Sequence, residues 1–243
     1  MFRTFAAHVT LACLTCRSTR PAAYARAMTT TRVLLVHGAA TTARVWAPLR
    51  ALLRADDVEV LAPDRRSTGD LTTEVAALAD AADGAVVVGV SGGATLGLAL
   101  ASSGAHLAGA VLHEPAVGSL VPGLLDHVVA GWATGGVPGF GRALYGPSWD
   151  PSMAPDDPDA VGRDLAMFRR FEPSPLDPGQ GPVVVTVGER SPAARHEAAR
   201  ALHDLLGIQV RVLAGAGHFV QHDDPLALVR VVRDVVAAAR AAA

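Results

Sequence analysis

From residue 32 onward, short apolar runs alternate with longer runs rich in Ala and Leu. Six apolar runs have the composition of strands: Arg32–His37, Val58–Leu61, Ala85–Val90, Leu107–His113, Pro182–Val187 and Gln209–Leu213. The runs between them predict helices near 43–54, 73–82, 93–103, 193–206 and 225–240. Because the strand candidates are continuously apolar, we expect them to be covered on both faces, as in the mostly parallel sheet of an α/β fold.

One interval, residues 116–181, contains no strong strand candidate and is rich in Gly and Pro. Helices are predicted within it at Leu120–Ala133 and Pro158–Phe171. It holds most of the large aromatic residues: Trp132, Phe140, Tyr145, Trp149, Phe168 and Phe171. An interval this long is unusual unless it is functional, so we interpret it as a helical lid inserted between two strands. We expect four of its aromatics to contact the substrate: Trp132, Phe140, Trp149 and Phe168. The alternative is that they pack into the main core.

Length and charge limit the function classes. The 243 residues suit one domain with a sizeable core, and half of them are hydrophobic. The formal net charge is -2 and no basic stripe stands out, which argues against a nucleic-acid partner. No uninterrupted apolar run reaches the roughly 18 residues of a membrane span. The partner we expect is a small-molecule substrate.

The sequence contains neither lysine nor asparagine. This excludes a Schiff-base lysine, a P-loop GKS/T, a Ser-Lys dyad, a Cys-His-Asn triad and N-glycosylation. The lone C-x-x-C of Cys13 and Cys16 has no second ligand cluster, so we expect neither a metal nor an organic cofactor. A bias toward Ala, Arg, Gly, Pro and Val accounts for both missing residue types.

Residues 1–27 form a weakly patterned leader. A mildly apolar stretch, Val9–Leu14, and an A-x-A at Ala25–Ala27 resemble a signal peptide, although the stretch is short. Met28 stands just before the first strand candidate and is equally consistent with a later start. We expect the folded domain to be 28–243 and favour a cytoplasmic protein, with secretion as the alternative.

The strongest motif is the G-x-S-x-G at Gly89–Gly93, between an apolar strand and an Ala/Leu-rich helix. A sharp strand-to-helix turn needs small neighbours, and it would raise the Ser91 hydroxyl above the sheet. The helix N-terminus behind it favours developing negative charge. These features make Ser91 the candidate nucleophile.

Two other loops follow strand candidates. Upstream, the N–H of Ala39 in the HGA loop and that of Gly92 are candidate oxyanion-hole donors, whereas we expect His37 to be structural. Downstream, His218 lies in the glycine-flanked loop GAGHF after the last strand. In that position it would be a general base toward Ser91 and then an acid toward the leaving group.

These elements, in this order, resemble the α/β-hydrolase superfamily over roughly residues 32–240. The likeness includes Ala62–Gly69, similar to the PDxRGxG segment of the family, and Trp46 after the HG loop. It implies an eight-stranded sheet with a lid after the sixth strand. This chain has no clear counterparts of the first two strands, so a sheet of about six is the other expectation.

The acid of the triad departs from the usual family pattern. Where most members have G-x-x-D after the seventh strand, this chain has Ser191 instead of the aspartate. In the haloalkane dehalogenase branch the acid follows the sixth strand, and Glu114 stands at that place. We therefore predict that Glu114 orients His218; the alternative is an ordinary strand-end carboxylate. That branch uses an aspartate nucleophile, whereas Ser91 supports acyl transfer to water.

The resemblance implies a serine hydrolase acting on a small or medium apolar ester through an acyl-enzyme. Thioesters, amides and carbon–carbon bonds beside a carbonyl remain open. One alternative is a non-catalytic small-molecule receptor of the same fold. Another is a dinucleotide-binding oxidoreductase, because glycines follow a strand and Glu114 ends the next one. That reading leaves the HGA and GAGHF loops without a purpose.

Overall fold

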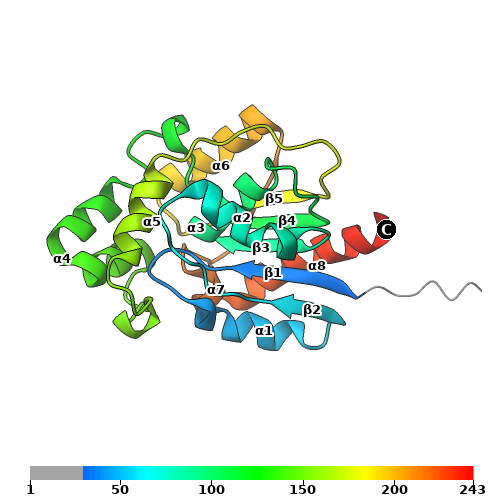
Figure 1. The fold of residues 1–243 in the computed structure, drawn as a ribbon, viewed down its shortest axis with the longest axis horizontal. Coiled ribbons are helices and arrows are strands. Elements are labelled where there is room, and N and C mark those ends of the chain that lie inside the picture. Colours follow the sequence, from blue (N-terminus) through cyan, green and yellow to red (C-terminus); the bar gives the residue numbers. More distant parts are fainter. Residues whose placement is uncertain (1–29, 243) are drawn as a thin grey trace, which may run out of the picture.

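A computed structural model describes residues 30–242. Its described strands form one parallel sheet in the order β2-β1-β3-β4-β5-β6 (Figure 1). They are β1 (Thr31–Val36), β2 (Val58–Leu61), β3 (Val86–Val90), β4 (Gly109–His113), β5 (Val183–Gly188) and β6 (Gln209–Leu213). Every residue of β3, β4 and β5 is buried, which explains their unbroken apolar sequences.

Helices cover both faces of the sheet (Figure 1). They are α1 (Ala47–Leu53), α2 (Leu71–Ala82), α3 (Gly92–Leu100), α4 (Asp126–Tyr145), α5 (Ala160–Arg169), α6 (Ala193–Leu206), α7 (Val220–Asp223) and α8 (Pro225–Ala242). A short 3-10 helix, Ala43–Trp46, precedes α1. Contacts join α1, α7 and α8 into one layer and α2 and α3 into the other, while α6 packs on β5 and β6.

The predicted α/β class and the six strand positions are confirmed, and β2 and β6 have the expected bounds. Of the two sheet sizes expected, the described part of the chain has the smaller. The leader at 1–27, including its C-x-x-C, lies outside the described residues.

The segment 116–181 connects β4 to β5 and contains no strand in the structure. Helices α4 and α5 lie beyond the carboxyl ends of the strands, on the left of Figure 1. Helix α4 runs further than the pattern predicts, to Tyr145, because two helical halves join at a kink at Gly136 (φ 54°). Pro138 is tolerated because it falls in the first turn of the second half.

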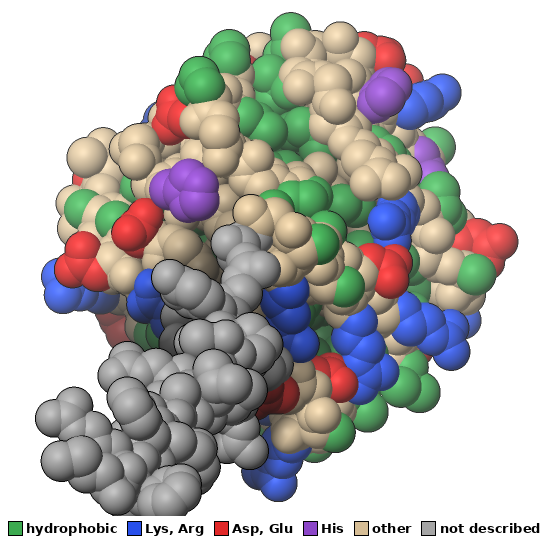
Figure 2. All heavy atoms as spheres, turned by 90° about the vertical axis from the view of Figure 1, so that its right-hand side faces the viewer, with side chains coloured by type: hydrophobic (Ala, Val, Ile, Leu, Met, Phe, Trp, Pro, Cys, Tyr) green, Lys and Arg blue, Asp and Glu red, His purple; other side chains and the backbone are tan. Residues whose placement is uncertain are grey.

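The opposite face, at the amino ends of the strands, shows interspersed basic and acidic side chains (Figure 2). There Arg233 of α8 donates to Asp56 at 2.7 Å, and Arg240 donates to the carbonyl oxygen of Asp57 at 2.6 Å. These contacts fix α8 against the turn before β2. Within residues 30–242, no helix has both the length and the hydropathy that crossing a membrane requires.

Candidate active site

Ser91 stands on a strained turn between β3 and α3, with φ 56° and ψ -123°. Its glycine neighbours are required by space. A Cβ on Gly89 would lie 2.4 Å from the carbonyl oxygen of Gly93, and a Cβ on Gly93 would lie 1.9 Å from that of Val36. The N–H of Ser91 donates to the carbonyl oxygen of His113 at 2.8 Å, which fixes the turn to β4. This turn therefore requires glycine at positions 89 and 93.

The HGA loop after β1 is held from above by α4 and the chain that follows it. The hydroxyl of Tyr145 donates to the carbonyl oxygen of Ala39 at 2.7 Å, and the indole N–H of Trp149 donates to that of Ala40 at 2.8 Å. Within the described chain, the backbone N–H groups of Ala39 and Gly92 donate no hydrogen bond. Both residues border the same cavity as Ser91.

Both ring nitrogens of His37 form hydrogen bonds with the surrounding backbone. Its Nδ1 lies 2.9 Å from the carbonyl oxygen of Gly38, and its Nε2 accepts from the N–H of Arg65 at 3.0 Å. Burial, reinforced by the charge of Arg65, lowers the pKa of His37 to about 3. A neutral imidazole bonded at both nitrogens holds the loop, as the sequence led us to expect.

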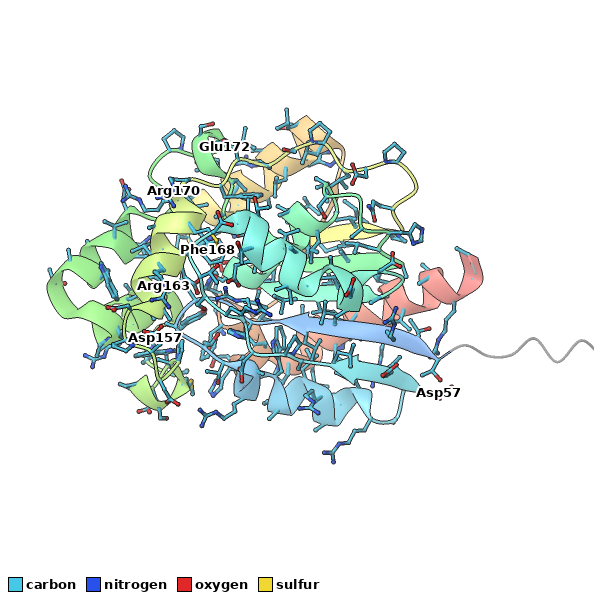
Figure 3. All side chains as sticks on the ribbon, in the orientation of Figure 1. Asp57, Asp157, Arg163, Phe168, Arg170 and Glu172 are labelled. Carbon is cyan, nitrogen blue, oxygen red and sulfur yellow. The ribbon has the colours of Figure 1, made fainter. Side chains whose placement is uncertain are left out.

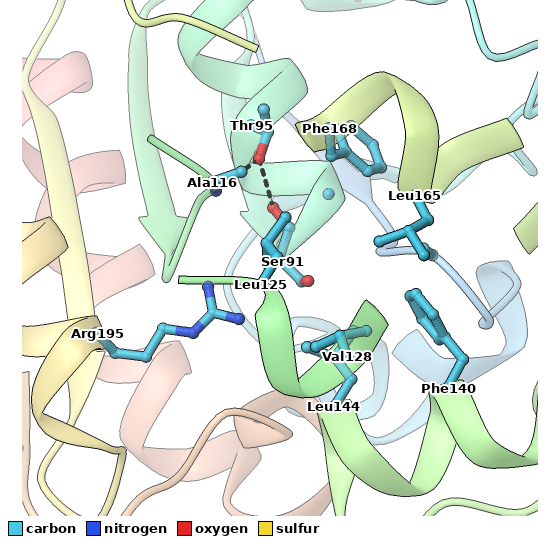
Figure 4. A pocket seen from close by; sticks show the side chains of 12 residues that line it. Ser91, Thr95, Ala116, Leu125, Val128, Phe140, Leu144, Leu165, Phe168 and Arg195 are labelled. Carbon is cyan, nitrogen blue, oxygen red and sulfur yellow. Dashed lines mark hydrogen bonds between the residues drawn. The ribbon is translucent and has the colours of Figure 1, made fainter. Parts of the chain in front are cut away.

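His218 and Glu114 meet although 104 residues separate them along the chain. The Nδ1–H of His218 donates to Oε2 of Glu114 at 2.6 Å, which places the proton on Nδ1 and leaves Nε2 as a lone-pair acceptor. That Nε2 is buried and has no hydrogen-bond partner among the described residues. The structure records no bond from it to Ser91, whose hydroxyl points into the adjoining cavity (Figure 4).

Glu114 is held by more than His218. Its other oxygen, Oε1, accepts from the N–H of Gly188 at 2.8 Å and from the hydroxyl of Ser191 at 2.5 Å. Its own backbone is strained, with φ 50°. Ser191, which occupies the place where an aspartate was expected, therefore contacts the carboxylate that we predicted instead.

His113 also supports this arrangement, although we did not single it out from the sequence. It is completely buried, with Nδ1 3.0 Å from the hydroxyl of Thr186 and Nε2 3.1 Å from the carbonyl oxygen of Gly217. The contact with Gly217 anchors the residue before His218. A strand-end histidine next to an acid was the only signal, and it is shared by many core histidines.

The electrostatics keep His218 neutral and Glu114 ionised. Burial, followed by the nearby charge of Arg195, lowers the pKa of His218 to about 4. Burial alone would raise the pKa of Glu114. The adjacent His113, the hydrogen bond from His218 and the Arg195 guanidinium outweigh it and hold that pKa well below its usual range. A neutral imidazole oriented by a carboxylate is the state that a general base requires.

A cavity adjoins Ser91, with about 340 Å³ of free space when the part open to solvent is included (Figure 4). It lies among α3, α4 and α5, and its walls are largely apolar. They are formed by Ala39, Ser91, Gly92, Thr95, Ala116, Leu125, Val128, Phe140, Leu144, Leu165, Phe168 and Arg195.

Two of the four aromatics expected at the substrate, Phe140 and Phe168, border this cavity. Within the described chain, the other two, Trp132 and Trp149, are not part of its wall. Trp132 packs edge-on against the Phe140 ring, with centroids 6.4 Å apart. Trp149 is nearly buried and packs against Gly141, while its N–H holds the HGA loop.

A buried ion cluster fixes α5 over the site. The Arg65 guanidinium pairs with Asp164 of α5 and lies 3.5 Å from Glu74 of α2, and it stands 5.7 Å from the Phe168 ring. Its Nε donates to the carbonyl oxygen of His37 at 2.9 Å. By contrast, the pair of Asp157 and Arg163 on the same segment is largely exposed (Figure 3).

No group of three or more His, Cys, Asp or Glu side chains in the described part of the chain is placed to hold a metal.

Comparisons with known proteins agree with this architecture. A family model described as the alpha/beta hydrolase family matches residues 33–231. Among curated proteins there is no significant match. The solved structures that resemble the chain include an enol-lactonase from Burkholderia xenovorans LB400 (22% identity, TM-score 0.66, covering 87% of this chain and 93% of that one).

Two further similar structures are described as esterases. One is esterase RhEst1 from Rhodococcus sp. ECU1013 (23% identity, TM-score 0.58, 86% of this chain and 90% of that one). The other is carboxylesterase CesB from Bacillus subtilis (17% identity, TM-score 0.60, 86% of this chain and 84% of that one). Likeness at these identities concerns the fold, and the family match covers most of the chain. The chain belongs to the alpha/beta hydrolase family.

Proposed function

We propose that the protein is a serine hydrolase that cleaves a small or medium carboxylic ester through an acyl-enzyme. In this proposal Ser91 is the nucleophile, His218 the general base and acid, and Glu114 the residue that orients His218. The supporting observation is the 2.6 Å hydrogen bond from His218 to Glu114, which leaves a buried Nε2 with no partner among the described residues. Ser91 itself stands on a strained turn at the end of β3, the strand that pairs with β4. The esterases and the lactonase among the similar structures agree with this chemistry.

The proposed reaction has two steps, acylation and then deacylation of Ser91. Oγ of Ser91 attacks the carbonyl carbon while its proton passes to Nε2 of His218, and the N–H groups of Ala39 and Gly92 stabilise the oxyanion. The intermediate collapses, the carbon–oxygen bond breaks, and the alcohol leaves with the proton from His218. Water then attacks the acyl-enzyme, gives a proton to His218 and releases the acid, and Ser91 recovers its proton.

This chemistry requires Ser91 Oγ to approach His218 Nε2. Rotation of the serine side chain about its Cα–Cβ bond redirects the hydroxyl without moving the backbone. Such hydrogen bonds are often long or unformed before substrate binds. The neutral His218 then needs no prior loss of a proton above about pH 4.

The walls of the cavity limit the substrate. Their apolar side chains favour a short hydrocarbon portion, and the space that they enclose beside Ser91 is small. We therefore expect short acyl chains to be processed better than long ones. The segment 116–181 would act as the lid in this proposal, since it supplies Phe140 and Phe168, which border the cavity.

The test is steady-state hydrolysis of para-nitrophenyl esters from acetate to octanoate. We expect turnover that is highest for short chains and falls at least about a thousandfold in Ser91→Ala. Folding of the variant is checked by its thermal unfolding. Absence of hydrolysis by the wild-type protein, or equal hydrolysis by Ser91→Ala, would contradict the proposal. The first result would favour the non-catalytic receptor.

A further inference from the structure

Arg195 is a buried cation in the wall of the cavity. It lies near the start of α6, and only 4% of its surface is exposed. Its guanidinium points from α6 toward Ser91 (Figure 4). Among the described residues that form the wall, it is the only one with a charged side chain. The sequence did not single it out, because it is one of 21 basic residues, all arginine.

The hydrogen bonds of this guanidinium are incomplete. A guanidinium has five N–H donors. In the described residues, one hydrogen bond uses them, from Nη1 to the carbonyl oxygen of Glu114 at 3.2 Å. The Nε group lies 3.7 Å from Oε2 of Glu114, which is beyond hydrogen-bond range. Most of the donors therefore have no hydrogen-bond partner among the described residues.

Glu114 does not saturate Arg195, because its own oxygens are engaged elsewhere. Oε1 accepts from Gly188 and Ser191, and Oε2 accepts from His218. Burying a cation without full hydrogen bonding is costly, so such a group is expected to have a partner when the site is occupied. The planar fork of an arginine fits a carboxylate, which accepts two parallel hydrogen bonds.

We propose that Arg195 binds a carboxylate of the substrate, so that the preferred substrate is an ester or lactone that carries a free carboxylate. The proposal rests on the serine-hydrolase function above and deepens it. Arg195 lies on one side of Ser91, and Phe140 and Phe168 lie on the other (Figure 4). A substrate centred on Ser91 then places its anionic end at Arg195 and its apolar end at the two rings.

Two pairs of esters test this, since the carboxylate can be on either side of the scissile bond. The first pair is para-nitrophenyl hydrogen adipate against para-nitrophenyl hexanoate. The second is meta-carboxyphenyl butanoate against phenyl butanoate. In at least one pair, we expect the wild-type protein to prefer the anionic member by about tenfold or more in kcat/KM, the size of one charge-assisted contact.

Arg195→Met should abolish that preference, and Arg195→Lys should keep part of it. The matched control is Arg200→Met, which removes an exposed arginine from the same helix and should keep the full preference. A second readout avoids turnover: in Ser91→Ala, adipate binding measured by calorimetry should weaken about tenfold or more when Arg195→Met is added.

Three outcomes would overturn the proposal. One is hydrolysis of neutral esters with no preference for the anionic member of either pair, which leaves the serine hydrolase standing. Another is an equal loss on both members in Arg195→Met, which would mean that Arg195 acts only through Glu114 and His218. The third is hydrolysis of neither member by the wild-type protein, which would remove the proposed function as well.

Discussion

The hydroxyl of Ser191 donates to Oε1 of Glu114 at 2.5 Å. The two residues are 77 positions apart, on the loops after β5 and β4. They represent the two places from which an acid can reach His218 in this fold. Here one place supplies the carboxylate, and the other supplies a hydrogen bond to it. In our account, Ser191 therefore helps to hold the carboxylate of Glu114 in position.

Because these two side chains touch, we expect that a carboxylate at position 191 can partly replace the one at position 114. Glu114→Gln should lower kcat by about a thousandfold to ten-thousandfold, because the oriented imidazole loses its carboxylate. Glu114→Ala should lose as much, and adding Ser191→Asp to it should recover at least about tenfold of the loss. Hydrolysis of a short para-nitrophenyl ester measures all three variants. Near-wild-type turnover in Glu114→Gln would remove Glu114 from the mechanism.

The control for the acid is Ser191→Ala. It removes one hydrogen bond from a buried carboxylate, so a cost of roughly 1–3 kcal/mol in stability and a modest loss of rate are expected. If Ser191→Ala were as inactive as Glu114→Gln, Ser191 would do more than position the carboxylate of Glu114.

The activity should persist at acidic pH. The pKa of His218 is lowered to about 4, and the base works only when it is neutral, so activity is lost only as pH falls through that value. We expect kcat/KM at pH 5 to exceed half of its value at pH 7. A histidine at the ordinary pKa of about 6.5 would retain roughly 3% there. Removing the charge in Arg195→Met should move the acidic limb to higher pH. A limb near pH 6.5 in the wild-type protein would contradict the burial argument.

The serine turn should reject any side chain at Gly93. In Gly93→Ala the new Cβ would lie 1.9 Å from the carbonyl oxygen of Val36, so β1 and α3 would have to separate. We expect a loss of more than about 3 kcal/mol in the free energy of unfolding, or no folded protein. Gly135→Ala is the control, because nothing lies within 4 Å of its Cβ and its φ is not positive. Urea unfolding should show that the control is neutral or more stable.

Tyr145 should influence the rate through the HGA loop. Tyr145→Phe keeps the ring that stacks on His218 and removes the hydrogen bond to the carbonyl oxygen of Ala39. The loop would then be less well positioned to offer its N–H to the oxyanion. We expect kcat to fall by about tenfold with a small change in KM. Equal kcat values for the variant and the wild-type protein would show that the loop holds its shape without this contact.

The buried ion cluster around Arg65 should contribute much of the stability with which α5 is held in place. Asp164→Asn leaves the Arg65 guanidinium buried without its main counter-charge, a change that typically costs about 3–5 kcal/mol. Asp157→Asn breaks the exposed pair with Arg163 and should cost less than about 1 kcal/mol. The comparison is made by denaturant unfolding of the two variants. Equal losses would mean that burial does not distinguish the pairs.

Much of the fold follows from the sequence, because strands that are buried on both faces have unbroken apolar runs. β2 and β6 begin and end where the pattern places them. The pattern does not predict the end of α4, because glycine and proline disfavour a helix interior, whereas here Gly136 forms a kink and Pro138 lies in the first turn after it. Local patterns do not reveal that two helical halves can join end to end.

Only part of the candidate site can be predicted from the sequence. The glycine pattern indicates Ser91 because the constraint is local, and the family resemblance directs attention from Ser191 to Glu114. Arg195 and the support from Tyr145 depend on segments that are distant in the chain, so no spacing indicates them. Trp149 was expected at the substrate, but its indole N–H holds Ala40. Aromatic content predicts burial better than it predicts which wall a ring will form.

The most direct test of the central claim is labelling with a fluorophosphonate probe, followed by peptide mapping. The probe reacts only with a serine that a neighbouring base activates. We predict one covalent adduct per chain, located on Ser91, that is absent in Ser91→Ala and strongly slowed in Glu114→Gln. An unlabelled wild-type protein, or an adduct on another residue, would contradict the account.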